Sequence, residues 1–347
     1  PMGCRTGFYL LTRGLTPDEA LRLKYRYLDL RNPAVKKNII LRCQVVAALR
    51  AAMTEHGFLE ITTPILTASS PEGARDYLVP ARKHPGKFYA LPQAPQQYKQ
   101  LLMVSGFDKY FQIAPCFRDE DARADRSPGE FYQLDFEMSF ATQEDVFRVG
   151  EEVLSATFEK FAPEGAEVTQ APYPIISYKQ AMLEFGTDKP DLRIDLVLTD
   201  ATEVMQGCGF AAFEGQTVKA IVVDGFTATR KQIDAICAEV EVQTARKGFW
   251  FRVDENGEFV GGISKFLQDR KEEVIKALGL KNGDFVGLAA GKKLEAQKTA
   301  GVYRKLLGAA SEKHMKKDCY EFCWIVDFPM YEIGEESGEL EFCHNPF

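Results

Sequence analysis

The sequence has no long uninterrupted apolar run. No stretch approaches the ~20 residues that a membrane-spanning helix needs, and the first residues, Pro1 to Leu11, show no cleavable signal pattern. Charged residues make up 27% of the chain and hydrophobic residues 45%, which excludes the compositions typical of disordered chains. We therefore expect a globular, cytoplasmic protein.

Paired metal-binding motifs are also missing. The eight cysteines are scattered without a Cys-x-x-Cys pair, and Cys319 and Cys323 have no second pair of ligands nearby. Free thiols in a reducing compartment are therefore expected, and no metal held by protein side chains. The net charge of −7 neither supports nor excludes a nucleic-acid partner, because a basic patch can lie on an acidic protein.

Periodicity and capping signals predict alternating helices and strands, and 347 residues suit two or three domains. Helices are expected over residues 16–25, 33–56, 143–161, 177–185, 230–239, 269–278 and 292–307. Strands are expected over residues 58–64, 88–91, 110–114, 131–140, 218–223, 248–253 and 321–327. Residues 282–288 are expected to form a turn that enters a strand. The glycine-rich character of residues 195–290 indicates a smaller α+β domain inserted into a larger one.

A polar strand face beside a charged loop is the most informative local feature. Residues 118–126 hold four acids and three arginines, and the strand that follows alternates apolar with polar residues from Tyr132 to Met138. Gln133, Asp135 and Glu137 thus share one face. A charge run is usually a solvated surface, but a polar face between apolar strands is costly to bury unless a polar ligand meets it. An arginine there suits a carboxylate or phosphate.

Several segments resemble class II aminoacyl-tRNA synthetases. Phe117 to Glu120 resembles their motif 2, and the helix ending at Gly57 with the strand closing on Pro64 resembles motif 1, which forms the dimer interface in that family. Three further stretches, in family order and at family-like spacing, resemble bacterial aspartyl-tRNA synthetases: Arg22–Arg31, Ser70–Asp76 and Leu91–Gln100.

This resemblance implies an α+β fold and a division of the chain. The fold would be a class II antiparallel sheet flanked by helices, with an inserted smaller α+β domain. We expect an unplaced tail at 1–15, the catalytic domain at 16–194, the insertion at 195–290 and a return to the catalytic domain at 291–347.

The resemblance also implies site residues. The catalytic residue would be Arg118, bridging the substrate carboxylate and the α-phosphate of ATP. L-aspartate would be held by Glu72, Gln96, Lys99, Arg118, Asp135 and His344. ATP would contact Arg118, Asp119, Glu120 and Gln133. Plainer interpretations remain for some of these: a solvated loop acid for Glu72, a surface lysine on a helix for Lys99, a structural hydrogen bond for Gln133 and a core histidine for His344.

The function implied is ATP-dependent activation of aspartate, with Mg²⁺, and transfer to tRNA by a homodimer. Ala94 and Asn345 depart from residues common in relatives, Ser and His respectively. The sequence ends at Phe347, before motif 3, and has no anticodon-reading barrel before residue 16, so we expect a truncated chain with little activity by itself. An asparaginyl- or lysyl-type synthetase, or a catalytically dead dimerising module, are the alternatives.

Overall fold

A computed structural model describes residues 18–70, 74–120, 129–334 and 338–342. The chain divides into two units, Pro1–Phe161 and Ala162–Phe347, and each is taken by itself below. The predicted domain boundaries at 194/195 and 290/291 stay predictions. Within the described residues, every helix is either too short or too polar to cross a lipid bilayer.

The first unit begins with helices whose ends follow their capping signals. After α2 (Glu19–Lys24) and α3 (Arg26–Asp29), the long helix α4 (Pro33–Glu55) starts with Pro33 in its first turn. The side chain of Asn32 accepts a hydrogen bond from the Ala34 N–H and so caps the helix. Gly57 follows with φ of +80°, a conformation that glycine adopts without strain. The predicted helix at 33–56 is thereby confirmed.

A three-stranded sheet forms the centre of this unit. Its order is β1–β4–β5, from β1 (Leu59–Glu60), β4 (Lys109–Phe117) and β5 (Glu130–Met138), with β1 parallel and β5 antiparallel to β4. The strand predicted at 58–64 is thus much shorter than expected. Helix α6 (Gln143–Phe161) has the predicted bounds. A hairpin, β2 (Leu78–Pro80) with β3 (Phe88–Ala90), and helix α5 (Gln96–Val104) lie between β1 and β4 in the sequence.

The two faces of this sheet differ as the alternation predicts. Leu134, Phe136 and Met138 of β5 pack against a buried cluster contributed by the sheet and by helices α4 and α6: Met53, Phe58, Phe111, Val149 and Val153. This packing confirms the predicted apolar face. The polar residues of β5 lie on the opposite face, where α5 contacts both β4 and β5. Because side chains alternate along β5, burial of its apolar side chains on one face of the sheet places its polar side chains on the other face.

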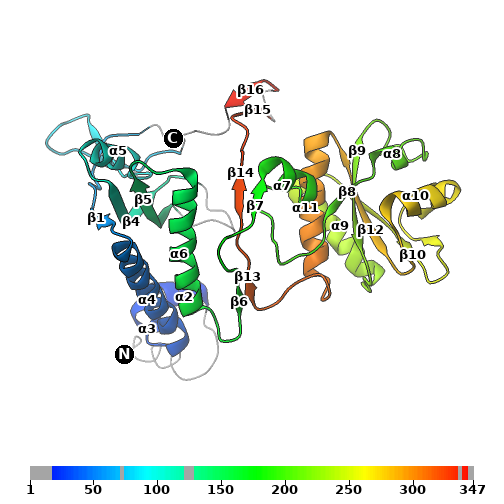
Figure 1. Ribbon diagram of the computed structural model, residues 1–347, viewed down its shortest axis with the longest axis horizontal. Coiled ribbons are helices and arrows are strands. Elements are labelled where there is room, and N and C mark those ends of the chain that lie inside the picture. The colour runs from blue at the N-terminus through cyan, green and yellow to red at the C-terminus, as the bar shows by residue number, and fades with distance from the viewer. Residues whose placement is uncertain (1–17, 71–73, 121–128, 335–337, 343–347) are drawn as a thin grey trace. The chain divides into compact units, whose positions relative to one another are not determined.

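The second unit is built around a five-stranded antiparallel sheet of order β11–β10–β12–β9–β8 (Figure 1). Its strands are β8 (Leu198–Asp200), β9 (Thr217–Val223), β10 (Gly248–Val253), β11 (Phe259–Val260) and β12 (Phe285–Gly291). Its helices are α8 (Thr202–Met205), α9 (Arg230–Thr244), α10 (Lys271–Leu278) and α11 (Lys293–Ala309). Two 3₁₀ turns, at Ser264–Phe266 and Gln268–Arg270, precede α10.

Helices cover both faces of this sheet, so all seven residues of its central strand β12 are buried. Val286 and Leu288 belong to the cluster shared with α8 and α10, whereas Phe285 and Ala289 belong to the cluster shared with α9 and α11. Figure 1 shows α9 and α11 together on one side and α10 on the other. The predicted turn at the start of 282–288 does lead into a strand, but β12 begins at Phe285 and continues three residues beyond the predicted element, to Gly291.

The rest of the second unit consists of short ladders. Strand β6 (Glu167–Val168) pairs in parallel with β13 (Cys319–Tyr320), and β7 (Ile175–Ser177) with β14 (Trp324–Val326). Helix α7 (Tyr178–Glu184) is capped by Ser177, and β15 (Tyr331–Ile333) forms a hairpin with β16 (Leu340–Phe342). The strand predicted at 321–327 is only three residues long.

Candidate active site

The candidate site lies on the polar face of β4 and β5. In the antiparallel register Asp135 stands opposite Gln112, and Glu137 stands opposite Tyr110. Residues directly opposite each other project from the same side of a sheet. Four polar side chains from two strands therefore share one surface, and α5 brings a fifth, Lys99, onto it.

Lys99 joins two of the predicted site residues. Its ammonium lies 2.8 Å from Asp135 Oδ1 and 2.9 Å from Glu137 Oε1, and the side chains of Lys99 and Asp135 are only 12% and 10% exposed. Burial opposes the charge of Lys99, but the hydrogen bonds to both carboxylates outweigh it and raise its pKa. Lys99 is therefore a half-enclosed cation and not the freely solvated surface lysine of the plainer interpretation.

Asp135 keeps one oxygen without a partner. Oδ1 accepts from Lys99, whereas Oδ2 is buried and accepts no hydrogen bond from the described residues. A buried carboxylate oxygen without a donor costs free energy, on the order of 1–3 kcal/mol or more. Such an oxygen is accordingly a good candidate for contact with a cationic ligand group.

Two residues of this face, Gln112 and Tyr110, form a buried hydrogen-bond layer that sequence reasoning did not anticipate. Gln112, only 3% exposed, accepts at Oε1 from the N–H and hydroxyl of Thr63 (3.3 and 3.1 Å) and from the Tyr110 hydroxyl (3.0 Å). Burial raises the pKa of Tyr110, and the nearby charge of Asp135 raises it further. The Tyr110 hydroxyl is thus held in its neutral form.

Gln133 contacts a second buried side chain. The thiol of Cys116, which is fully buried, donates to Gln133 Oε1 at 3.1 Å. With its oxygen engaged in this way, the amide of Gln133 leaves its N–H groups to other partners. The structural hydrogen bond that formed the alternative interpretation is therefore present, and the predicted ligand contact remains a prediction.

Arg118 follows β4 directly. Its backbone N–H donates to the Gly129 carbonyl (2.7 Å), and its guanidinium lies 5.0 Å from the centre of the Phe131 ring. Phe131 projects from the same face as Gln133, because the two are separated by two positions on one strand. Among the described residues, no carboxylate forms an ion pair with Arg118, so its guanidinium is available for an anion.

The residues after Arg118 connect to the loop that precedes β2. The Asp119 N–H donates to the Arg75 carbonyl (2.9 Å), and Arg75 Nε donates to the Asp119 carbonyl (3.0 Å). Glu120 is exposed. Asp119, which is predicted to contact ATP, is therefore hydrogen-bonded to the loop that contains the Ser70–Asp76 stretch, and Glu120 follows it directly.

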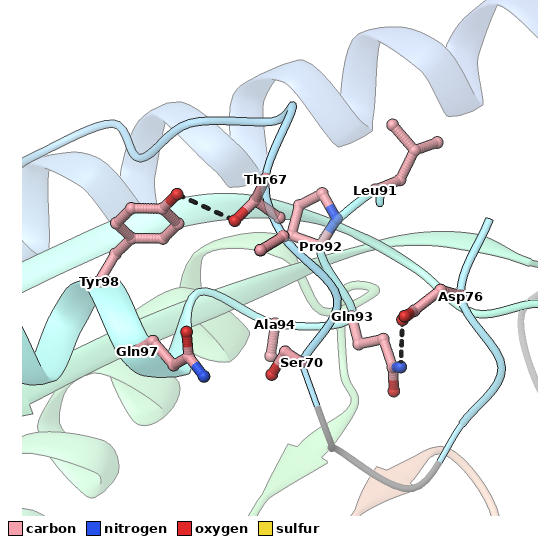
Figure 2. A pocket seen from close by; sticks show the side chains of 10 residues that line it. Thr67, Ser70, Asp76, Leu91, Pro92, Gln93, Ala94, Gln97 and Tyr98 are labelled. Carbon is pink, nitrogen blue, oxygen red and sulfur yellow. Dashed lines mark hydrogen bonds between the residues drawn. The ribbon is translucent and has the colours of Figure 1, made fainter. Parts of the chain in front are cut away.

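A small pocket lies where this loop meets the start of α5 (Figure 2). Gln93 is only 2% exposed and forms three hydrogen bonds to this loop. Its Oε1 accepts from the Ala74 N–H (3.1 Å), and its Nε2 donates to the Ala74 carbonyl (2.9 Å) and to Asp76 Oδ1 (2.6 Å). Across the pocket the Thr67 and Tyr98 hydroxyls are 2.9 Å apart. Ser70, Ala94 and Gln97 lie together in the same view. Sequence reasoning missed Gln93, although it stands inside a stretch that carried the resemblance.

Three predicted aspartate contacts are less well defined. Gln96 is the first residue of α5, one turn before Lys99, and is half-buried. Glu72 and His344 lie outside the described residues, so their roles stay predictions. The other predicted site residues lie within the described part of the chain: Lys99 on α5, Gln133 and Asp135 on β5, and Arg118 directly after β4.

Comparison with known proteins identifies a family over almost the whole chain. Residues 18–347 match the family model described as tRNA synthetases class II (D, K and N). The asparaginyl-tRNA synthetase of Pyrococcus horikoshii, solved with asparaginyl-adenylate, aligns over 85% of this chain and 72% of its own, with 17% identity and a TM-score of 0.42. That structural similarity is too low to carry an argument.

Curated relatives are similar at the sequence level. The aspartate–tRNA(Asp/Asn) ligase of Zymomonas mobilis is 54% identical over 95% of this chain, and the aspartate–tRNA ligase of Streptomyces avermitilis is 52% identical over the same share. The aspartate–tRNA(Asp/Asn) ligase of Rickettsia conorii is 51% identical over 98% of the chain. The chain spans 56–57% of the length of these relatives.

Proposed function

Because the chain belongs to the class II tRNA synthetases of the D, K and N type, we propose that its site binds L-aspartate and ATP, joins them as aspartyl-adenylate and serves transfer of the aspartyl group to tRNA. The observation that carries this proposal is the half-buried trio of Lys99, Asp135 and Glu137, in which one cation faces two carboxylates and one carboxylate oxygen has no partner among the described residues.

The trio suits both charged ends of aspartate. The side-chain carboxylate of the ligand would approach Lys99, a charge complement that asparagine does not supply. The ammonium would approach Asp135 Oδ2, forming a charge-assisted hydrogen bond to an oxygen that otherwise lacks one. The relatives named as aspartate–tRNA ligases support this choice of amino acid.

Arg118 would act on the reacting groups. A guanidinium can hold the α-carboxylate of aspartate and an α-phosphate oxygen of ATP together, which aligns nucleophile and phosphorus for in-line attack. Negative charge grows on the phosphate oxygens during that attack, and a fixed cation stabilises it. Gln133, with N–H groups not engaged by Cys116, would add a donor on the same face.

Mg²⁺ accompanies ATP in the reaction that the family resemblance implies. Within the part of the chain that the structure describes, no three His, Cys, Asp or Glu side chains converge as a metal site requires.

The partners follow from the same proposal. tRNA would be the acceptor, and a second copy of the chain would pair through α4, whose Ile39 and Ile40 are 45% and 46% exposed. Apolar side chains in such numbers on one helix are typical of an interface. Six thiols are free in the described residues, which suits a reducing compartment such as the cytoplasm.

Calorimetric titration of this chain with L-aspartate, L-asparagine and L-lysine tests the proposal. We expect aspartate to bind at least about tenfold more tightly than either competitor, since one unmatched buried charge costs on the order of 1.4 kcal/mol or more. Preferential binding of lysine or asparagine, or no preference among the three, would refute it.

A further inference from the structure

Glu137 is the most exposed member of the trio that it forms with Lys99 and Asp135. Its side chain is 32% exposed, whereas those of Lys99 and Asp135 are 12% and 10% exposed. Glu137 stands on β5 two positions after Asp135 and therefore projects from the same face of the sheet. A ligand group that reaches the ammonium of Lys99 consequently lies next to Glu137, whose Oε1 is only 2.9 Å from Lys99 Nζ.

The trio contains more negative charge than positive charge. Lys99 is a single cation between two carboxylates, and within the described residues neither carboxylate pairs with a second basic side chain. Effects on a neighbouring phenol agree with this excess. Burial is the largest cause of the raised pKa of Tyr110, and the negative charges of Asp135 and Glu137 add to it. The polar face is therefore net negative around its one cation.

A net negative site treats ligands according to their own charge. Succinate has both carboxylates of aspartate and lacks the ammonium group, so it is the more negative of the two compounds. Both can present a carboxylate to Lys99, but only aspartate carries a cation that Glu137 attracts. Because most of the Glu137 side chain is enclosed by protein, solvent screens its charge only in part. This carboxylate therefore favours the amino acid over the dicarboxylate.

We propose that Glu137 is a specificity-determining residue of this site, whose charge selects ligands with an ammonium group and weakens the binding of dicarboxylates that lack one. The inference rests on the proposed function and deepens it, because it names a class of compound that the site excludes. Lys99 by itself does not make this distinction, since it attracts the carboxylates of both classes.

Three substitutions isolate the charge of Glu137 from its shape. Glu137→Gln keeps the length of the side chain and an oxygen that can accept from Lys99, and it removes the negative charge. Glu137→Asp keeps the charge and shortens the side chain. Glu130→Gln is the matched control, because it removes the same charge from an exposed position of the same strand whose side chain points to the opposite face.

The measurement is the ratio of the affinities of L-aspartate and succinate for the full chain, by calorimetry. Glu137→Gln should lower this ratio about tenfold, mainly by strengthening succinate binding, because a repulsion between like charges at short range is lost. Glu137→Asp and Glu130→Gln should each keep the ratio within about threefold of the unsubstituted chain. Thermal unfolding identifies a variant that does not fold. Should Glu137→Gln be such a variant, Glu137→Thr, with a side chain that suits strands, takes its place.

The outcomes separate this inference from the proposed function. An unchanged ratio in Glu137→Gln would refute the role of Glu137, while a preference for aspartate over asparagine and lysine would still support the proposed function. An equal fall in Glu137→Asp would assign the effect to shape, and an equal fall in Glu130→Gln would assign it to the overall charge of the chain; either result refutes the inference. An unsubstituted chain that binds aspartate and succinate equally well refutes the inference alone, and one that binds neither refutes both.

Discussion

Among single residues, the proposed function gives Lys99 the largest share in the choice of amino acid. It is the cation that holds Asp135 and Glu137 together on the polar face, and it is the charge that an aspartate side chain would meet. Removing this cation leaves two half-buried carboxylates facing the same space. A negatively charged ligand should then be repelled, whereas a neutral one should be affected much less.

The corresponding prediction concerns Lys99→Met. Aspartate affinity should fall about 100-fold or more, equivalent to loss of one buried charge pair of roughly 3 kcal/mol, and the preference over asparagine should disappear. Lys87→Met, at an exposed position before β3, is the matched control and should bind as the unsubstituted chain does. Calorimetry with both amino acids gives the answer, and an unchanged preference in Lys99→Met would rule out its role.

Arg118 supports a second prediction at this scale. Arg118→Ala should weaken binding of a non-hydrolysable sulfamoyl analogue of aspartyl-adenylate by about 100-fold, since bonds between a guanidinium and an anion contribute roughly 1.5–3 kcal/mol each. Stability should change by no more than about 1 kcal/mol, because the guanidinium lies over the Phe131 ring and forms no ion pair with a described residue. Arg82→Ala, an exposed arginine, is the control. Retained affinity in Arg118→Ala would contradict the assignment.

The sequence predicted some of these residues and not others, for a physical reason. Asp135 and Gln133 follow from strand alternation alone, and Lys99 follows from a resemblance over a continuous stretch. Gln112 and Gln93 act through buried hydrogen bonds to segments 49 and 19 residues away in the sequence. Such partners depend on strand register and loop path, and a single glutamine in a strand or loop does not reveal either.

At the scale of elements, helix α11 holds the segment that leads into β8. Arg304, only 1% exposed, donates to the carbonyls of Leu196 (2.5 Å), Ile194 (2.6 Å) and Asp191 (3.2 Å). Asp191 in turn forms a two-bond contact with Arg193, at 2.9 and 2.7 Å. These contacts replace the regular hydrogen bonds that the irregular segment lacks.

This arrangement predicts a specific pH dependence. Hydrogen bonds from Arg193 hold the pKa of Asp191 below its ordinary value, so Asp191 contributes stability above about pH 3.9, the unfolded-state value. That contribution is lost as the pH falls through the lower folded-state pKa. Thermal unfolding between about pH 2 and 5 should therefore depend less on pH in Asp191→Asn than in the unsubstituted chain. Equal pH dependence in both would contradict the assignment.

Element boundaries were predictable where the local chemistry is strong. Asn32 with Pro33, and Ser177 before α7, mark helix starts that the structure confirms. Helix α9 runs five residues beyond its predicted end at Glu239, to Thr244, and this extra turn buries Val240 completely. The strands at 58–64 and 321–327 are shorter than predicted, since β pairing depends on a distant partner and not on local pattern.

For the whole molecule, the proposed second copy can be tested through α4. Ile40→Glu places a charge among the exposed apolar residues of this helix and should convert a dimer to a monomer, because a desolvated unpaired charge is costly at an interface. Lys37→Glu, exposed on the same helix, changes charge without removing apolar surface and should leave the dimer intact. Sedimentation velocity distinguishes the two, and a monomer in the unsubstituted chain would refute pairing through α4.

The central claim is that the polar side chains of α5, β5 and Arg118 together bind both aspartate and the nucleotide. A crystal structure of the chain with the sulfamoyl analogue of aspartyl-adenylate tests it most directly. The account predicts the ligand ammonium within hydrogen-bond distance of Asp135 Oδ2, its side-chain carboxylate on Lys99, and its sulfamoyl group on Arg118. A ligand bound on another surface, or one whose ammonium and carboxylate avoid Asp135 and Lys99, would contradict it.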